Sequence, residues 1–258
     1  MPNPENSQPL YDFASDPIEV HINLTPKADF KTISTHRLRK RTLDQVRQRE
    51  RAITMEEREV NRKESEFLYD DEAANLAHYD ALIVAANGYD LDGSDPDGTR
   101  FIALAGEEND QVRALIPVQH KLAVIAGLDT ARAELLQEEG RAFRLGGDRT
   151  QRVRLRKGQY ELIFTMQEGD ERKRKRYTRS MQIRQVRGSR KGQKRFVSDL
   201  QTVVDLFDAQ FIAVTGGELQ GEQFRPELRS AFLSGIDPID KRAVIDALYS
   251  ELEAELQD

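Results

Sequence analysis

The chain has 258 residues, of which 33% are charged, with no cysteine and a formal net charge of -6 at pH 7. The lack of cysteine excludes disulfides, zinc–thiolate sites and thiol catalysis. No apolar run approaches the roughly 18 residues that span a bilayer, and the N-terminus lacks the basic start and apolar stretch of a signal peptide. We therefore expect a cytoplasmic protein that does not contact membranes.

Charge is distributed unevenly along the chain. Residues 141–195 contain 19 Lys and Arg against 5 Asp and Glu, which leaves a balance of -20 on the remaining residues. Segregation of this size indicates partners or self-association rather than a particular fold.

The first 36 residues are predicted to form an extended arm followed by short strands. Residues 1–17 are polar and hold four prolines. Residues 18–24 alternate apolar and polar side chains, which is the period of a half-buried strand. Phe30 and Ile33 are expected to lie in a second extended piece.

Residues 37–140 are predicted to be a helical region that begins with a long charged helix. Thr42 and Gln45 have the spacing of a capping box at its start. Single apolar residues then recur every seven positions: Val46, Ile53, Val60 and Phe67. The stripe is narrower than that of a two-stranded coiled coil, because the companion heptad positions are acidic. Either the helix lies along its own domain by this edge, or a second subunit completes it and the four residues are a self-association surface.

Two further helices are expected in this region, one ending at Gly88 and one running from Val118 to Gly140. Between them, the loop from Asp90 to Gly98 gathers four carboxylates, as a calcium loop would. An EF-hand needs glycine at its sixth position and glutamate at its twelfth, and neither register of this loop supplies them. We interpret the loop as an acidic turn.

Residues 141–258 are predicted to form a basic antiparallel sheet covered by C-terminal helices. In residues 151–157 apolar side chains face one side and arginines the other, and residues 160–166 alternate in the same way after a glycine turn. A third strand is expected through Tyr177, Met181 and Ile183. The predicted class is α+β, with a helical N-terminal half, a basic antiparallel β-meander and acidic C-terminal helices packing on the sheet. No internal repeat is apparent.

No motif for catalysis, metal or cofactor binding is found. The four histidines are not paired on one helical face, and no phosphate-binding, dinucleotide-binding or nucleophile-elbow signature occurs. We therefore expect a protein that is not an enzyme and that needs no metal and no cofactor.

The strongest candidate for a binding site is the set of basic residues along and after the predicted sheet: Arg152, Arg154, Arg156, Arg174, Arg176, Arg184, Lys191, Lys194 and Arg195. These side chains suit a phosphate backbone, an acidic protein surface, or simply an exposed charged sheet. Readout of bases usually adds exposed aromatic side chains, and Tyr177 is the single candidate here.

We therefore expect an assembly, adaptor or chaperone-like protein that acts through protein surfaces or self-association. A component of a larger, phage-like assembly is one form of this expectation. The alternative is a non-specific nucleic-acid-binding module that uses the basic sheet at residues 141–195.

Overall fold

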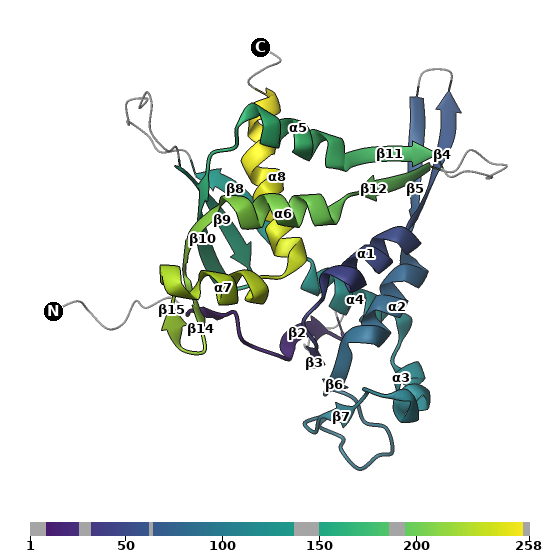
Figure 1. The fold of residues 1–258 in the computed structure, drawn as a ribbon. Coiled ribbons are helices and arrows are strands. Elements are labelled where there is room, and N and C mark those ends of the chain that lie inside the picture. The colour runs from purple at the N-terminus through teal and green to yellow at the C-terminus, as the bar shows by residue number, and fades with distance from the viewer. Residues whose placement is uncertain (1–8, 26–31, 62–63, 137–149, 186–193, 255–258) are drawn as a thin grey trace. The chain divides into compact units, whose positions relative to one another are not determined.

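A computed structural model describes residues 9–25, 32–61, 64–136, 150–185 and 194–254 (Figure 1). Helices alternate with mainly antiparallel sheets along the described chain, which confirms the predicted α+β class.

The chain divides into two compact units. The N-terminal unit comprises residues 15–129 and 183–197, and the C-terminal unit comprises residues 1–14, 130–182 and 198–258. This division differs from the predicted boundaries at residues 36 and 140. The first strands belong with the helices that follow them, and the arm belongs with the C-terminal residues.

The N-terminal unit is built on an antiparallel sheet with the order β2-β3-β6-β7. Helix α4 packs on α2 and on β2, and the core between them includes Leu38, Tyr79 and Val124, all fully buried. A second sheet, with the order β11-β12-β4-β5, is made of two hairpin ribbons. The elements are β2 (Ile18–Asn23), β3 (Ile33–Leu38), α1 (Leu43–Ala52), β4 (Thr54–Asn61), β5 (Glu64–Asp70), α2 (Glu72–Leu82), β6 (Ile83–Ala86), β7 (Ile102–Ala103), η2 (Glu107–Asn109), α3 (Asp110–Leu115), α4 (Val118–Leu128), β11 (Met181–Gln185) and β12 (Lys194–Ser198).

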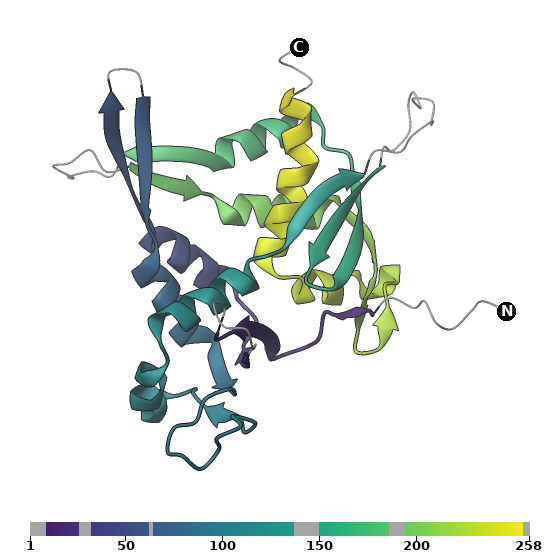
Figure 2. The same ribbon diagram turned by 180° about the vertical axis from the view of Figure 1, so that it is seen from behind.

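The C-terminal unit is built on an antiparallel sheet with the order β13-β10-β9-β8. Helix α8 packs on β8, β9 and α6, as the predicted helix-covered sheet requires (Figures 1 and 2). Val153, Leu155, Leu162, Phe164 and Met166 of the central hairpin are fully buried in its core. The elements are β1 (Tyr11–Asp12), β8 (Arg132–Leu136), β9 (Thr150–Lys157), β10 (Tyr160–Gln167), α5 (Glu171–Ser180), α6 (Leu200–Gln210), β13 (Phe211–Thr215), β14 (Gly217–Leu219), β15 (Glu222–Gln223), η3 (Pro226–Leu228), α7 (Arg229–Gly235) and α8 (Pro238–Ala254).

The long helix predicted from Thr42 to Phe67 is wrong beyond its first three turns. The capping box is present, since Gln45 N donates to Thr42 Oγ1 at 3.2 Å and Thr42 N to Gln45 Oε1 at 2.9 Å. Helix α1 nevertheless ends at Ala52, and the chain continues into the paired strands β4 and β5. One apolar residue in seven gives a helix too little surface to bury, so strand pairing overrides the helical pattern.

The predicted self-association stripe therefore does not exist as one helical face. Val46 is buried on α1, Ile53 is the C-cap residue that follows this helix, Val60 is on β4 and Phe67 is on β5.

The third strand of the predicted meander is also wrong. The hairpin β9–β10 is present, but Tyr177 lies on helix α5, and Met181 and Ile183 lie on β11, which pairs with β12 instead. Asp170 caps the start of α5 by accepting a hydrogen bond from Lys173 N at 2.8 Å. Residues 171–180 also lack the strand alternation of apolar side chains, so a capped helix is the better local structure.

The chain repeats one order of elements, which the sequence did not reveal. Residues 18–128 and residues 150–254 each contain a hairpin, a helix, a two-stranded ribbon, a second helix, a third strand, a 3₁₀ turn, a short helix and a last helix. The ribbon of the second copy, β11 and β12, falls almost entirely in the N-terminal unit. Helices α1 and α5 begin and end 128 positions apart, and so do α2 and α6. The third strand pairs with the second in both units, and its register shifts at the same place, after Arg37 in one and after Thr165 in the other.

A glycine after the third strand shows the same backbone in both copies. Gly88 and Gly216 each have φ of +85°. A Cβ on Gly88 would lie 3.1 Å from the carbonyl oxygen of Ile33, and a Cβ on Gly216 would lie 2.1 Å from that of Glu161. Ile33 and Glu161 are again 128 positions apart, so the same close approach demands glycine twice.

The last helices carry the clearest sequence match, at a spacing of 120. Lys121, Ala123, Val124, Ile125 and Leu128 of α4 match Lys241, Ala243, Val244, Ile245 and Leu248 of α8. The two lysines also have similar surroundings. Lys121 Nζ lies 3.1 Å from Asp80 and 5.4 Å from the Tyr79 ring centre. Lys241 Nζ lies 2.7 Å from Asp208 and 5.6 Å from the Phe207 ring centre. We use the word counterpart for residues that occupy the same place in the two copies.

Candidate functional site

The arginines of β9 alternate with buried residues as predicted, but two of them are paired within the sheet. Arg154 lies 2.8 Å from Glu134 on β8 and 3.3 Å from Glu161 on β10, and Arg156 lies 3.6 and 3.7 Å from the same carboxylates. Arg152 is exposed on the same face. The outer face of the sheet is therefore only mildly positive, because the two glutamates offset part of its charge.

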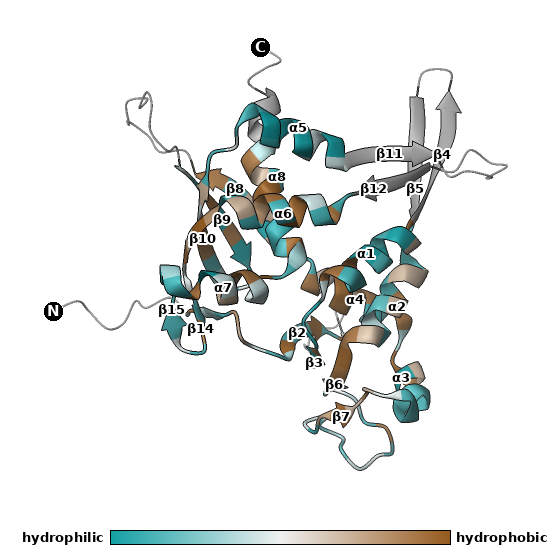
Figure 3. Ribbon diagram, viewed as in Figure 1, coloured by the Kyte–Doolittle hydropathy of each residue, from teal (hydrophilic) through white to brown (hydrophobic). Residues whose placement is uncertain are grey.

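The densest basic feature in the described residues is helix α5. Six of its ten residues are Lys or Arg, and Figure 3 shows it as hydrophilic along its length. Lys175 pairs with Glu171 at 2.7 Å and Arg176 with Asp205 at 3.1 Å. The hydrogen bond and charge of Lys175 hold the pKa of Glu171 below its ordinary value.

An open groove of about 760 Å³ lies between α5 and the start of α6. Five of its lining residues are cations, which we call the basic face of α5: Arg172, Lys173, Lys175, Arg176 and Arg179. Glu171, at the start of α5, and Asp199, which caps α6, bring carboxylates into the same groove. The groove therefore presents a cluster of cations with two acidic groups inside it.

Tyr177, the one aromatic residue considered for base stacking, points away from this face. Its hydroxyl donates to Asp246 at 2.8 Å, and its ring stacks on Tyr249 with centres 5.0 Å apart. The basic face of α5 thus offers charge without an aromatic platform.

The remaining predicted basic residues are not all brought to this place. Arg174 and Arg176 are on α5, while Arg184, Lys194 and Arg195 are on β11 and β12, whose side chains are not described. Lys191 lies outside the described residues. Arg172, Lys173, Lys175 and Arg179 line the groove and were not predicted, because the segment was expected to be a strand and not a helix with its cations along one groove.

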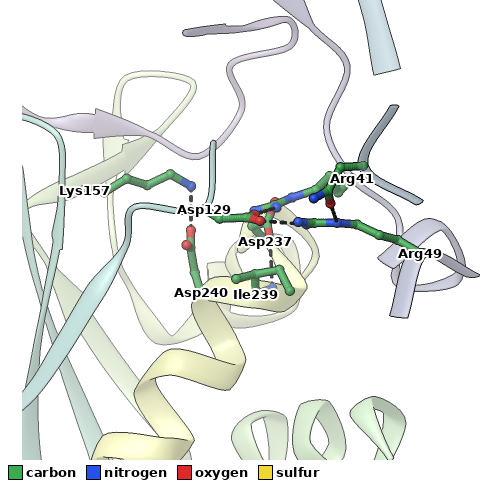
Figure 4. A network of polar contacts seen from close by, with 8 residues as sticks. Arg41, Arg49, Asp129, Lys157, Asp237, Ile239 and Asp240 are labelled. Carbon is green, nitrogen blue, oxygen red and sulfur yellow. Dashed lines mark hydrogen bonds and ion pairs between the residues drawn. The ribbon is translucent and has the colours of Figure 1, made fainter. Parts of the chain in front are cut away.

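Two buried ion clusters occupy other parts of the fold (Figure 4). In the C-terminal unit, Lys157 Nζ lies 2.7 Å from Asp240, which is 2% exposed. Burial alone would lower the pKa of Lys157, but the charges of Asp240, Tyr11 and Asp237 and the hydrogen bond to Asp240 together outweigh burial and raise the pKa. In the N-terminal unit, Arg41 and Arg49 both bind Asp129. Lys157 and Asp240 are buried, whereas Asp129 is 26% exposed and its two arginines are largely buried, and we assign both clusters a structural role.

A chain of polar side chains runs through the core of the N-terminal unit. His36 is fully buried, and its ring nitrogens lie 3.0 Å from the Tyr79 hydroxyl and 3.1 Å from the Tyr89 hydroxyl. Tyr89 continues to His120 at 3.2 Å. Burial lowers the pKa of His36 to about 4, with a smaller contribution from His120. The counterparts of His36 and Tyr79 are Phe164 and Phe207, so this polar chain belongs to one copy only.

The acidic loop that begins at Asp90 is held together by hydrogen bonds between its own carboxylates and nearby backbone amides. Asp90 accepts from Gly93 N at 2.8 Å, Asp92 from Ser94 N at 3.0 Å, and Asp95 from Arg100 N at 2.8 Å. Hydrogen bonds to Ser94 lower the pKa of Asp92, and a bond from the Arg100 amide does so for Asp95. The loop is organised by its own amide groups, as an acidic turn is.

No protein-family model, curated protein or solved structure matches the chain. Among the described helices, none combines the length and apolar character needed to cross a bilayer.

Proposed function

We propose that the protein is a non-catalytic assembly or adaptor protein that docks an acidic surface of a partner protein against the basic face of α5. The observation that carries the proposal is the concentration of five cations along one groove of the C-terminal unit. Charge of this kind steers association and selects partners of opposite sign. Cytoplasmic residence remains part of the proposal.

Two features favour a protein partner over nucleic acid. The carboxylates of Glu171 and Asp199 line the same groove, where they would repel phosphates but can accept hydrogen bonds from a protein that carries mixed charges. Tyr177 is turned toward Asp246 and Tyr249, so the groove lacks the stacking surface on which single-stranded nucleic acid usually depends.

Non-specific binding to nucleic acid is the second candidate function. The observation in its favour is the same density of cations, since neutralising phosphates releases counterions whatever the base sequence. The basic sheet is the weaker part of this alternative, because Glu134 and Glu161 already pair with Arg154 and Arg156.

The experiment is co-purification of the untagged protein from its source at low salt, with and without nuclease. The test variant combines Arg172→Gln, Lys173→Gln and Arg179→Gln. A matched control removes three exposed cations elsewhere, by Arg39→Gln, Arg100→Gln and Arg225→Gln. We expect a protein that survives nuclease treatment, dissociates at high salt, and is lost from the test variant but kept by the control. Loss of all bound material on nuclease treatment, or equal binding by both variants, would contradict the proposal.

A further inference from the structure

The groove that the arm fills in the C-terminal unit has an open counterpart in the N-terminal unit. In the C-terminal unit, β1 pairs in parallel with β14, Tyr11 N donates to Gly216 O at 3.0 Å and Phe13 N to Glu218 O at 2.7 Å. Phe13 is 1% exposed and packs its ring edge-on against Phe232, with centres 5.4 Å apart. The arm is thus an extended segment held by backbone pairing and buried aromatic side chains.

The residues that hold the arm, together with Asp240 near Tyr11, have counterparts that line a pocket of about 390 Å³ in the N-terminal unit. At a spacing of 128, the counterparts of Gly216, Gly217 and Glu218 are Gly88, Tyr89 and Asp90. At a spacing of 120, the counterparts of Phe232, Gly235 and Asp240 are Val112, Leu115 and His120. All six counterparts line the pocket.

The two copies differ in how this space is filled. A Cβ on Gly217 would lie 2.4 Å from the Phe13 ring and one on Gly235 would lie 2.8 Å from the Phe13 carbonyl oxygen, so Tyr89 and Leu115 exclude a segment lying just as the arm does. Tyr89 instead turns inward to His36 and His120. Two other aromatic residues of the C-terminal unit, Phe224 and Phe232, have the smaller counterparts Leu104 and Val112, which line the pocket. Replacing two rings by aliphatic side chains leaves room for one aromatic side chain from outside.

The rim of the pocket is apolar and exposed. Leu115 is 67% exposed and Leu91 is 42% exposed, and both line the pocket. The counterpart of Leu91, Leu219, is partly buried and packs on the core that includes Phe13. Beyond this rim lies the acidic loop that holds Asp90, Asp92 and Asp97.

We propose that this pocket binds an extended segment of another protein, which inserts one aromatic side chain between Val112 and Leu115 and carries basic residues beside it. In the C-terminal unit the equivalent elements hold an extended aromatic segment, although in a pose that Tyr89 and Leu115 exclude here, and the acidic loop favours positive charge next to the pocket. A second copy of this chain would have to withdraw its own arm, in which Phe13 is already buried. The occupant is therefore a segment of a different protein.

The probe is a fluorescein-labelled peptide with the sequence of residues 9–15, made with its natural Asp12 and with Asp12→Lys. The intact protein is titrated and anisotropy is measured. The tethered arm has an effective concentration in the millimolar range, so micromolar peptide will not displace it and reports on the open pocket. We expect saturable binding, tighter for the lysine peptide, and at least about tenfold weaker when both peptide aromatics are alanine.

Two variants locate the binding. Val112→Phe installs the counterpart ring and should fill the pocket, and Leu115→Ser removes its exposed rim; each should weaken binding at least about tenfold. Ile212→Ser is the matched control, because Ile212 is also 42% exposed but lies outside the pocket. If Val112→Phe does not fold, Leu115→Ser still tests where the peptide binds. The side chain of Leu115 is 67% exposed, so its replacement should not disturb folding.

Three outcomes would overturn the proposal. The first is no saturation with either peptide up to about 1 mM, a range that covers weak segment binding. The second is binding that Leu115→Ser leaves unchanged. The third is concentration-dependent self-association of the wild type that Leu115→Ser abolishes, which would make a second copy the occupant.

Discussion

His36 should make the N-terminal unit sensitive to mild acid. An unfolded histidine takes up its proton near pH 6.5, whereas burial holds the pKa of folded His36 at about 4. Between these values the unfolded chain binds more protons than the folded chain, so stability is complete above about pH 6.5 and is lost as the pH falls toward 4. The full loss is about 3 kcal/mol, and about 2 kcal/mol of it is already reached at pH 5.

The copy of the fold in the C-terminal unit supplies the variant that tests this reasoning. Replacing His36 and Tyr79 by their counterparts, with His36→Phe and Tyr79→Phe, removes the titrating group and should remove most of the loss between pH 7.5 and 5. The assay is urea unfolding followed by circular dichroism at both values, and pH 5 stays above the range in which most carboxylates titrate.

His21→Gln is the control, because His21 is exposed and bonds only to Thr35 in the described residues. It should keep the acid sensitivity of the wild type. A wild type equally stable at both pH values, or a double variant that loses as much stability as the wild type, would refute a buried neutral His36.

Three further predictions concern stability and use the same unfolding assay. Phe13→Ala should destabilise the C-terminal unit by about 3 to 5 kcal/mol, because it empties a fully buried site; no change would mean that the arm does not pack there. Lys241→Met should cost about 1 to 2 kcal/mol, since it removes the buried partner of the partly exposed Asp208, and Lys121→Met should cost less, because Arg113 stays 3.6 Å from Asp80. A larger loss in Lys121→Met than in Lys241→Met would contradict this reasoning. Changing Arg152, Arg154 and Arg156 together to Gln should cost less than about 1 kcal/mol, because their ion pairs are solvent-exposed; a larger loss would make the outer face of the sheet a structural feature.

Local signals predicted the elements whose side chains are patterned by burial. Val153 and Leu155 alternate with arginines, and the hairpin β9–β10 follows with the expected face inward. The capping box at Thr42 marks the start of α1 correctly. The end of that helix was missed because the pairing of β4 with β5 determines it, and no single residue in the sequence signals this pairing.

The repeat was hidden by its changing spacing and by differences in the cores. Counterparts lie 128 positions apart through the first two helices and 120 apart in the last, because the loop after Gly88 is longer than the turn after Gly216. The counterpart of His36 is Phe164 and that of Leu104 is Phe224. Each copy therefore packs its core with different side chains. A comparison at one fixed period therefore could not align the two halves.

The candidate site was predictable as a basic segment but not as a surface. Composition identified residues 141–195 as positive. Assigning residues 171–180 to a strand would have placed Tyr177 with the inward residues and divided the cations between two faces. On a helix, five of them line one groove, and this arrangement became visible only with the fold.

The choice between a protein partner and nucleic acid is tested most directly by one binding measurement. Labelled 20-base-pair duplexes of two unrelated sequences are titrated with the wild type at 150 mM salt, and with the variant that combines Arg172→Gln, Lys173→Gln and Arg179→Gln. The account predicts weak binding, with a Kd above about 10 µM for both duplexes, as expected for charge without stacking or specific contacts. Submicromolar binding of both duplexes that the variant abolishes would contradict it and make the basic face of α5 a nucleic-acid site.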